Sequence, residues 1–122
     1  MSGVGTAREG PLNRLERMTY PQLERLAART DLALLPVAPV EAHGPHLPLG
    51  TELIAATELC ERAARGVAAR GLECVLAPPL AYCLAEVASS FPGTIGVREG
   101  AVSAVVEDIC RGLARSGFPK PS

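Results

Sequence analysis

The chain has 122 residues, of which 48% are apolar and 20% are charged, and its formal net charge is −1. This length fits one domain and is too short for two domains of ordinary size. The near balance of charge argues against a binding surface for nucleic acid or an anionic membrane, and without an apolar run of about 18 residues or a signal-like N-terminus we expect a cytoplasmic protein.

The first expected element is a helix that begins after Thr19. Residues 1–18 precede this helix and are expected to form a flexible N-terminal segment, because the first residues of the segment are small and polar. Thr19 and Gln22 have the Thr-x-x-Gln spacing of a capping box, and Pro21 fits the first helical turn. The helix is expected to end near Arg29.

Two short apolar runs predict buried strands. The run over residues 32–40 has the length of a strand in a parallel sheet, although Pro36 has no backbone N–H to donate there. A second strand is expected over residues 73–77, because Pro78 and Pro79 follow it directly.

Two longer segments have the periodicity of helices. Residues 53–70 are apolar on one face, and Gly71 suits the position just past a helix end. In the last helix an apolar stripe runs over residues 102–113, which predicts a face buried against a sheet. Residues 116–117, Ser-Gly, are expected to end it.

The alternation of strands and helices predicts an α/β fold with a parallel sheet. Only two strands are convincing, which is fewer than an ordinary sheet contains, and no strand follows the last helix. We therefore expect the domain to be truncated.

The cysteines do not indicate a metal ribbon or a redox pair. They are widely spaced and form no Cys-x-x-Cys motif, and we expect them to be small buried apolar residues. Cys83 alone lies outside an expected helix or strand, so a thiol enzyme would have to use it, with His43 or His46 as the base. The four are Cys60, Cys74, Cys83 and Cys110.

Residues 41–52 carry the densest polar chemistry and follow directly on the first expected strand. Both histidines of the chain lie there, and Glu41 and Glu52 bracket the segment. In open α/β sheets ligands bind just beyond the carboxyl ends of strands. Imidazole with carboxylate is a ligand set for Zn²⁺ or Mn²⁺. Residues two apart in an extended segment point the same way, so Glu41 and His43 can reach one metal, and a turn at Gly44 would let Glu52 return to it. Alternatively, these side chains simply hydrogen-bond the amides of their own loop.

This segment closely resembles a block of a known family. Residues 40–52 resemble the Glu-x-His-Gly-Pro-His-Leu-Pro block of the creatininase (creatinine amidohydrolase) family. Phe91-Pro92-Gly93-Thr94, followed by an apolar helix and Gly117-Phe118, resembles the family's next block. The resemblance covers residues 19–118, where it implies a three-layer α/β domain of creatininase type, and leaves residues 119–122 as a short tail.

The resemblance also implies an activity. It indicates a cytoplasmic hydrolase of cyclic or linear amides that uses a pair of divalent ions, typically zinc or manganese, and often assembles as a hexamer. By motif position Glu41 and His43 match metal ligands, and Glu52 matches a ligand carboxylate that is usually Asp. His46 matches the block's second histidine, with a role behind the ligands or beside the substrate. Glu86 lies in a loop near the pocket.

Three departures from the family pattern weaken this expectation. Glu52 is one methylene longer than Asp, and a displacement of about 1 Å can remove much of an active site's rate. Val87 stands where the family often has a histidine after the glutamate. After Phe118 the family continues with a strand and an Asn-Gly-His-Gly-Gly-Asn-like segment that carries the remaining ligands, which residues 119–122 lack. We then expect at most one, weakly held metal, and an apolar face on the last helix that is open to association.

Two functions remain open. The first is a metal-dependent amidohydrolase in which metal-activated water attacks a small cyclic or peptide-like amide, with the missing ligands supplied by another chain or a longer product. The second is a truncated, catalytically inactive family member that acts as a fragment or interaction module, in a homo-oligomer or paired with a full-length relative. We expect the isolated chain to be inactive.

Overall fold

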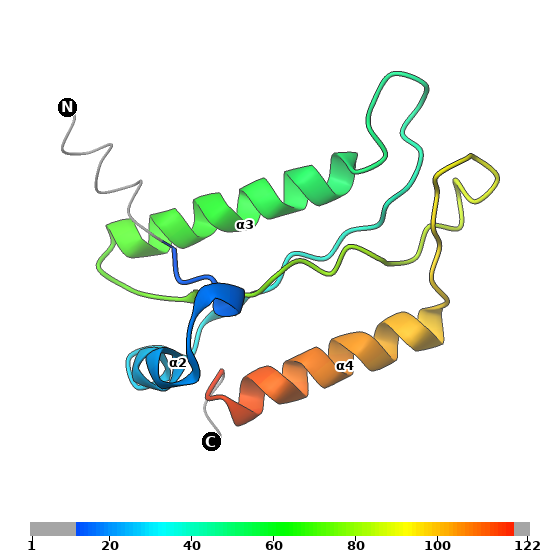
Figure 1. The fold of residues 1–122 in the computed structure, drawn as a ribbon. Coiled ribbons are helices and arrows are strands. Elements are labelled where there is room, and N and C mark those ends of the chain that lie inside the picture. The colour runs from blue at the N-terminus through cyan, green and yellow to red at the C-terminus, as the bar shows by residue number, and fades with distance from the viewer. Residues whose placement is uncertain (1–11, 119–122) are drawn as a thin grey trace, which may run out of the picture.

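The chain forms three layers around a pair of short parallel strands. The computed structural model describes residues 12–118. Strand β1 (Ala33–Leu34) pairs with β2 (Val75–Leu76) in parallel, with Ala33 opposite Val75. Helix α3 (Thr51–Ala69) lies on one side of the extended segments and α4 (Glu99–Arg115) on the other, while α2 (Tyr20–Ala27) lies near one end (Figure 1). The predicted α/β fold with a parallel sheet is confirmed.

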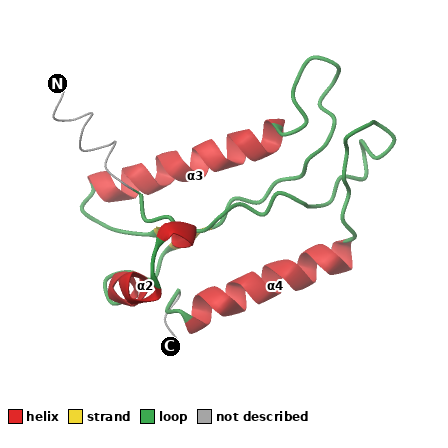
Figure 2. Ribbon diagram, in the orientation of Figure 1, coloured by secondary structure: helices red, strands yellow, loops and turns green. Residues whose placement is uncertain are grey.

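The two extended segments run side by side well beyond the strands themselves. Pro36 has no N–H, so regular pairing stops there, but its carbonyl still accepts a hydrogen bond of 2.9 Å from Leu80 N. Pairing resumes as an isolated parallel bridge between Val37 and Leu80. Most of this region therefore lacks the regular hydrogen bonds of a strand and is drawn as loop (Figure 2). The two segments nevertheless continue in the direction of the strands. The predicted strands 32–40 and 73–77 are thus shorter than expected.

The helix boundaries follow the sequence signals closely. The Thr19 side chain accepts from Gln22 N, and the Gln22 side chain accepts from Thr19 N at 2.8 Å, so the predicted capping box is present. Helix α3 ends before Gly71 at φ +75° and α4 ends before Gly117 at φ +104°. Both glycines take the left-handed conformation that ends helices at low steric cost.

The C-terminal end of α4 is held by a Schellman motif. Gly117 N donates to Ala114 O at 3.0 Å and Phe118 N donates to Leu113 O at 2.8 Å, the two bonds that define the motif. Phe118 is 2% exposed and packs with Leu26 and Val75, against which Leu113 also packs. This cluster joins α2, β2 and the end of α4 in one core.

Residues 12–18 belong to this packed region, whereas the sequence placed them in a flexible segment. Leu15–Arg17 form a short 3₁₀ helix, labelled η1, and Leu15 and Met18 pack against the Phe118 cluster. Leu76 N donates to Asn13 O at 2.8 Å, so this segment also pairs with the free edge of β2. The rest of the expected segment, residues 1–11, and the expected tail, residues 119–122, lie outside the described residues.

The apolar stripe of α4 is less buried than its periodicity predicts. None of its helical residues is buried, and Val105 is 43% exposed. Amphipathic periodicity specifies which face would be buried but not whether a surface is present to cover it. Within residues 12–118, no helix is both long enough and apolar enough to cross a membrane.

Candidate metal centre

Residues 41–52 form a hairpin-like loop that begins beyond the carboxyl end of the β1 segment. Gly44 adopts φ +72°, and His43 faces Leu47 in an antiparallel bridge. Glu41 N then donates to Leu49 O at 3.0 Å. The returning chain enters α3 at Thr51, not at Leu53 as predicted, so the loop delivers residue 52 to the first turn of the helix.

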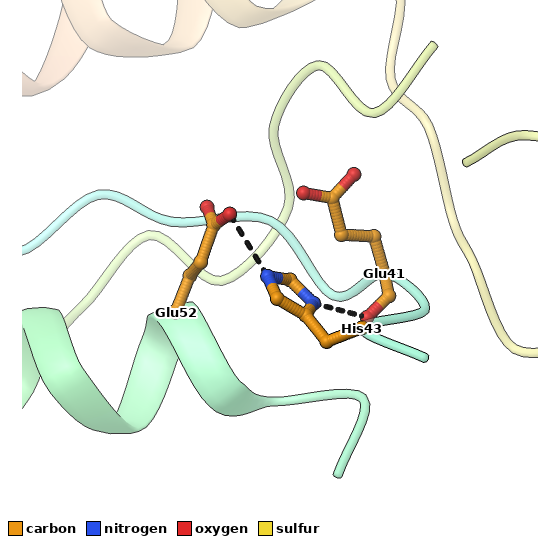
Figure 3. Close-up of side chains that lie close together, drawn as sticks. All are labelled: Glu41, His43 and Glu52. Carbon is orange, nitrogen blue, oxygen red and sulfur yellow. Dashed lines mark hydrogen bonds and ion pairs between the residues drawn. The ribbon is translucent and has the colours of Figure 1, made fainter. Parts of the chain in front are cut away.

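The three predicted ligands lie together. Glu41, His43 and Glu52 each offer a ligand atom, and these atoms lie within 4.8 Å of one another. His43 Nε2 lies 3.0 Å from Glu52 Oε1, and His43 Nδ1 lies 3.0 Å from the backbone carbonyl oxygen of Glu41 (Figure 3). The His43 side chain is 21% exposed and that of Glu52 is 49% exposed, so the cluster is open to solvent on one side.

The contacts of His43 define its protonation. A carbonyl oxygen can only accept, so Nδ1 carries a proton that it donates to Glu41. Nε2 faces the Glu52 carboxylate, which favours a second proton there. The pKa of His43 is raised above its ordinary value, first by the hydrogen bond to the Glu41 carbonyl and then by the hydrogen bond to Glu52. The Glu41 contact therefore engages Nδ1 and leaves Nε2 as the nitrogen that faces the Glu52 carboxylate.

A second loop braces the ligand segment. Thr94 Oγ1 accepts a hydrogen bond of 2.9 Å from Ala42 N, and Ile95 N donates to Val40 O at 3.0 Å. Gly93 has φ +84°, and a Cβ at this position would lie 2.3 Å from Leu49 Cδ1. The sequence marked residues 91–94 only as a family block, so the bracing role of Thr94 was missed; its place in that block was the available signal.

His46 and Glu86 are not brought into the cluster. Within residues 12–118, neither side chain makes a hydrogen bond or ion pair. The His46 ring lies close to Gly44, where a Cβ would be 3.2 Å from its Cε1. Glu86 lies in the exposed part of the 80–98 loop, next to Val87, which is 99% exposed. Their assignment as groups near the ligands or substrate stays a prediction.

An apolar pocket of about 610 Å³ lies beside the ligand loop. Its lining includes Ala42, Gly44, Leu49 and Phe91, and none of the three predicted ligands. Alternate residues of an extended segment face opposite sides. We infer that the pocket and the ligand cluster occupy opposite sides of residues 41–44.

The cysteines give no support to a thiol site. All four are free, and Cys74 is buried among apolar residues, which raises the pKa of its thiol. Cys83 makes no contact with either histidine among the hydrogen bonds of the described region, and its backbone carbonyl accepts from Val97 N. Among the described residues, the structure instead brings together the imidazole of His43 and the carboxylates of Glu41 and Glu52.

Comparison with known proteins identifies related sequences. The family model described as creatininase, creatinine amidohydrolase, matches residues 16–121. A creatinine amidohydrolase of Pseudomonas putida is 31% identical over 106 residues, which are 82% of this chain and 39% of that protein. A mycofactocin precursor peptide peptidase of Mycobacterium ulcerans is 35% identical over 85 residues, or 66% of this chain and 34% of that protein.

Solved structures agree with these sequence relatives. A structure described as creatininase Mn superposes with a TM-score of 0.77 at 26% identity and covers 88% of this chain. A mutant creatininase of the Zn-Zn type gives a TM-score of 0.72 at the same identity and coverage. This chain covers 42% of each of those chains. It therefore spans less than half the length of the proteins that it matches.

Proposed function

Because the chain belongs to the creatininase family, we propose that residues 41–52 form part of the divalent-metal centre of an amidohydrolase. The observation that carries the proposal is the convergence of three ligand atoms, from Glu41, His43 and Glu52, within 4.8 Å of one another. Two come from one loop and the third from the first turn of α3. Glu52 lies nine residues from His43 in the sequence, so the fold of the loop is what brings its carboxylate to the His43 ring.

The donor set fits a zinc or manganese ion. One imidazole nitrogen with two carboxylates is typical of hydrolytic sites for these metals, and the related structures are of Mn and Zn-Zn types. The hydrogen bond from His43 Nδ1 to the Glu41 carbonyl fixes the ring and leaves Nε2 as the ligand atom, an arrangement common among metal-binding histidines. When bound, a divalent ion supplies Lewis-acid polarisation of an amide carbonyl and lowers the pKa of a water molecule.

The chain's own residues then have distinct tasks. Glu41 contributes in two ways, with its backbone carbonyl orienting His43 and its carboxylate serving as a ligand. Glu52 accepts a hydrogen bond from Nε2 when metal-free His43 is protonated, and this proton must leave before Nε2 can bind a cation. His46 and Glu86 are proposed to act beside the substrate.

The three proposed ligands limit how many metal ions the described residues can hold. Three ligands suffice for one ion with an open position, but a pair of ions needs more. We propose that protein outside residues 12–118 supplies the others. This limit favours a second candidate function, in which the chain alone binds one ion without turnover and serves as an inactive fragment or interaction module, in a homo-oligomer or with a full-length relative.

The proposed substrate is a small cyclic or linear amide, or a peptide-like amide, and the proposed compartment is the cytoplasm. Creatinine amidohydrolase and mycofactocin precursor peptide peptidase represent both kinds of amide among the relatives. A 3-dehydro-scyllo-inosose hydrolase of Thermotoga maritima, 27% identical over 106 residues, is also similar. The proposed reaction is hydrolysis of a carbonyl compound. The first two relatives favour an amide as that compound.

A metal titration with two histidine variants tests the proposal. Metal-free chain is titrated with Zn²⁺ and with Mn²⁺ by calorimetry, and His43→Gln is compared with His46→Gln, its matched control in the same loop. Binding of one ion that His43→Gln abolishes and His46→Gln leaves intact supports the site. Hydrolysis of creatinine or of a peptide amide by the loaded chain would favour the enzyme, and binding without hydrolysis would favour the inactive candidate. Equal loss in both variants, or no binding at all, would contradict the proposed site.

A further inference from the structure

A second pocket, of about 300 Å³, lies at the other end of the molecule from the ligand loop. It is formed between residues 12–18 and α2, whereas residues 41–50 project from the opposite end of the extended segments (Figure 1). Four arginines line it, and no acidic residue does. Its polar lining consists of Arg14, Arg17, Arg25, Arg29, Asn13 and Gln22.

Two of the arginines are held in place by carboxylates outside the lining. Arg14 Nη2 contacts Glu61 Oε2 at 2.8 Å. Arg29 donates to both oxygens of Glu73, from Nε at 2.5 Å and from Nη2 at 3.2 Å. The pKa of Glu73 is lowered, chiefly by its hydrogen bond from Arg29. These pairs fix two guanidinium groups and neutralise two of the four positive charges.

The other two arginines keep their charge. Within residues 12–118, the side chains of Arg17 and Arg25 make no hydrogen bond or ion pair, and both residues are exposed. They come from different elements, Arg17 from η1 and Arg25 from the last turn of α2. The pocket therefore has two uncompensated guanidinium groups that reach it from two sides.

Gln22 adds an amide donor to the pocket lining. Its Oε1 is occupied by the backbone N–H of Thr19 in the capping box, at 2.8 Å. The amide nitrogen is then the end of the side chain that remains available, and it can only donate. The capping box, which the helix needs for its own start, thus leaves a hydrogen-bond donor available on a residue that lines the pocket.

We propose that this pocket binds a phosphoryl group of a small phosphorylated molecule. Planar guanidinium forks match the oxygens of phosphate in pairs, and phosphate has enough acceptor oxygens to use both free arginines and the Gln22 amide at once. Because the pocket lies apart from the ligand loop, the molecule binds there in addition to the amide substrate. The inference needs no metal and does not depend on the proposed hydrolase activity.

Pyrophosphate binding to the metal-free full chain tests this inference. Calorimetry at low salt is expected to show one saturable site, and Arg17→Gln and Arg25→Gln are each expected to weaken it by about fivefold or more. Arg115→Gln is the matched control, because Arg115 also lies in the last turn of its helix, where a cation interacts with the helix dipole in the same way as Arg25. Circular dichroism checks that each variant is folded.

Each outcome bears on the proposal. One site that is lost in Arg17→Gln and Arg25→Gln but kept in Arg115→Gln supports it. No saturable binding would overturn it, and so would an equal loss in all three variants, because that pattern indicates general attraction of an anion to exposed arginines. Binding that survives both pocket variants would overturn it as well.

Discussion

Thr94 Oγ1 accepts a hydrogen bond of 2.9 Å from the backbone N–H of Ala42, a residue that lies between Glu41 and His43 and is 52 positions away in sequence. The contact joins the loop of the second family block to the segment that carries two predicted ligands. Ala42 N has this side-chain oxygen as its partner in place of a sheet neighbour. The geometry of the ligand cluster therefore depends on a residue that is not itself a ligand.

Replacing Thr94 with Val should weaken metal binding. The substitution keeps the side-chain volume but removes the acceptor, so the Ala42 N–H loses its partner and the segment between the ligands loosens. A net hydrogen bond contributes about 0.5–1.5 kcal/mol, which corresponds to a roughly two- to tenfold loss of affinity in a Zn²⁺ titration. Thr57→Val, within α3 and away from the loops, serves as the control. Unchanged affinity in Thr94→Val would show that the brace does not support the site.

Metal affinity should rise with pH through the raised pKa of His43. When metal-free His43 is protonated, Nε2 donates to Glu52, and that proton competes with a cation for the same nitrogen. Because the pKa lies above the ordinary 6.5, the competition persists at a higher pH than for an ordinary histidine. Calorimetric titrations across neutral pH should show increasing affinity with release of a proton. A flat affinity would mean that His43 is not a ligand.

Glu52→Gln should lower the pKa of His43 without returning it fully to the ordinary value. The substitution removes the carboxylate, but the Glu41 carbonyl, the larger cause of the shift, remains. A raised pKa of His43 stabilises the folded state when the pH is below 6.5, the pKa in the unfolded state. This stabilisation disappears as the pH rises through the pKa of His43 in the folded state. NMR titration of the His43 ring measures the change directly, with Glu86→Gln as a control that should leave it unaltered. The same pKa in both variants would exclude the Glu52 contact in solution.

Gly117→Ala, just past the end of α4, should destabilise the fold, whereas Gly112→Ala within α4 should not. Gly117 has φ +104°, and a Cβ there would lie 2.9 Å from the Cβ of Ala27, so we expect a loss of about 1–3 kcal/mol. At Gly112 nothing lies within 4 Å of a new Cβ, and a helical alanine should add about 0.5–1 kcal/mol. Urea unfolding of both variants measures the difference. Similar free energies of unfolding would argue against the Schellman motif.

Local signals in the sequence predicted the elements well because local contacts determine them. Thr19 and Gln22 form their capping box with each other, and Gly71 and Gly117 end their helices through their own backbone conformation. The grouping of Glu41, His43 and Glu52 was also predicted, from the spacing and the expected turn at Gly44. That these residues bind a metal remains a proposal.

Other features depend on contacts that no local pattern contains. The strand segment around Pro36 was predicted as one strand, but a missing N–H interrupts regular pairing until Leu80 provides a partner for its carbonyl. Thr94 acquires its role only because its loop lies against Ala42. The apolar stripe of α4 was predicted to be buried, yet burial requires a covering surface, and the helical periodicity is the same whether that surface is present or absent.

The attachment of α4 at one end has a consequence for how the protein opens. Leu113, near its C-terminus, is the helix residue that packs against the buried Phe118 cluster, and no residue of the helix is itself buried. Amide protons in its first turns should therefore exchange with solvent far faster than those of β2, through local opening that leaves the strand pair intact. Exchange should slow progressively toward Phe118, which would make α4 a hinged unit anchored by a single aromatic ring.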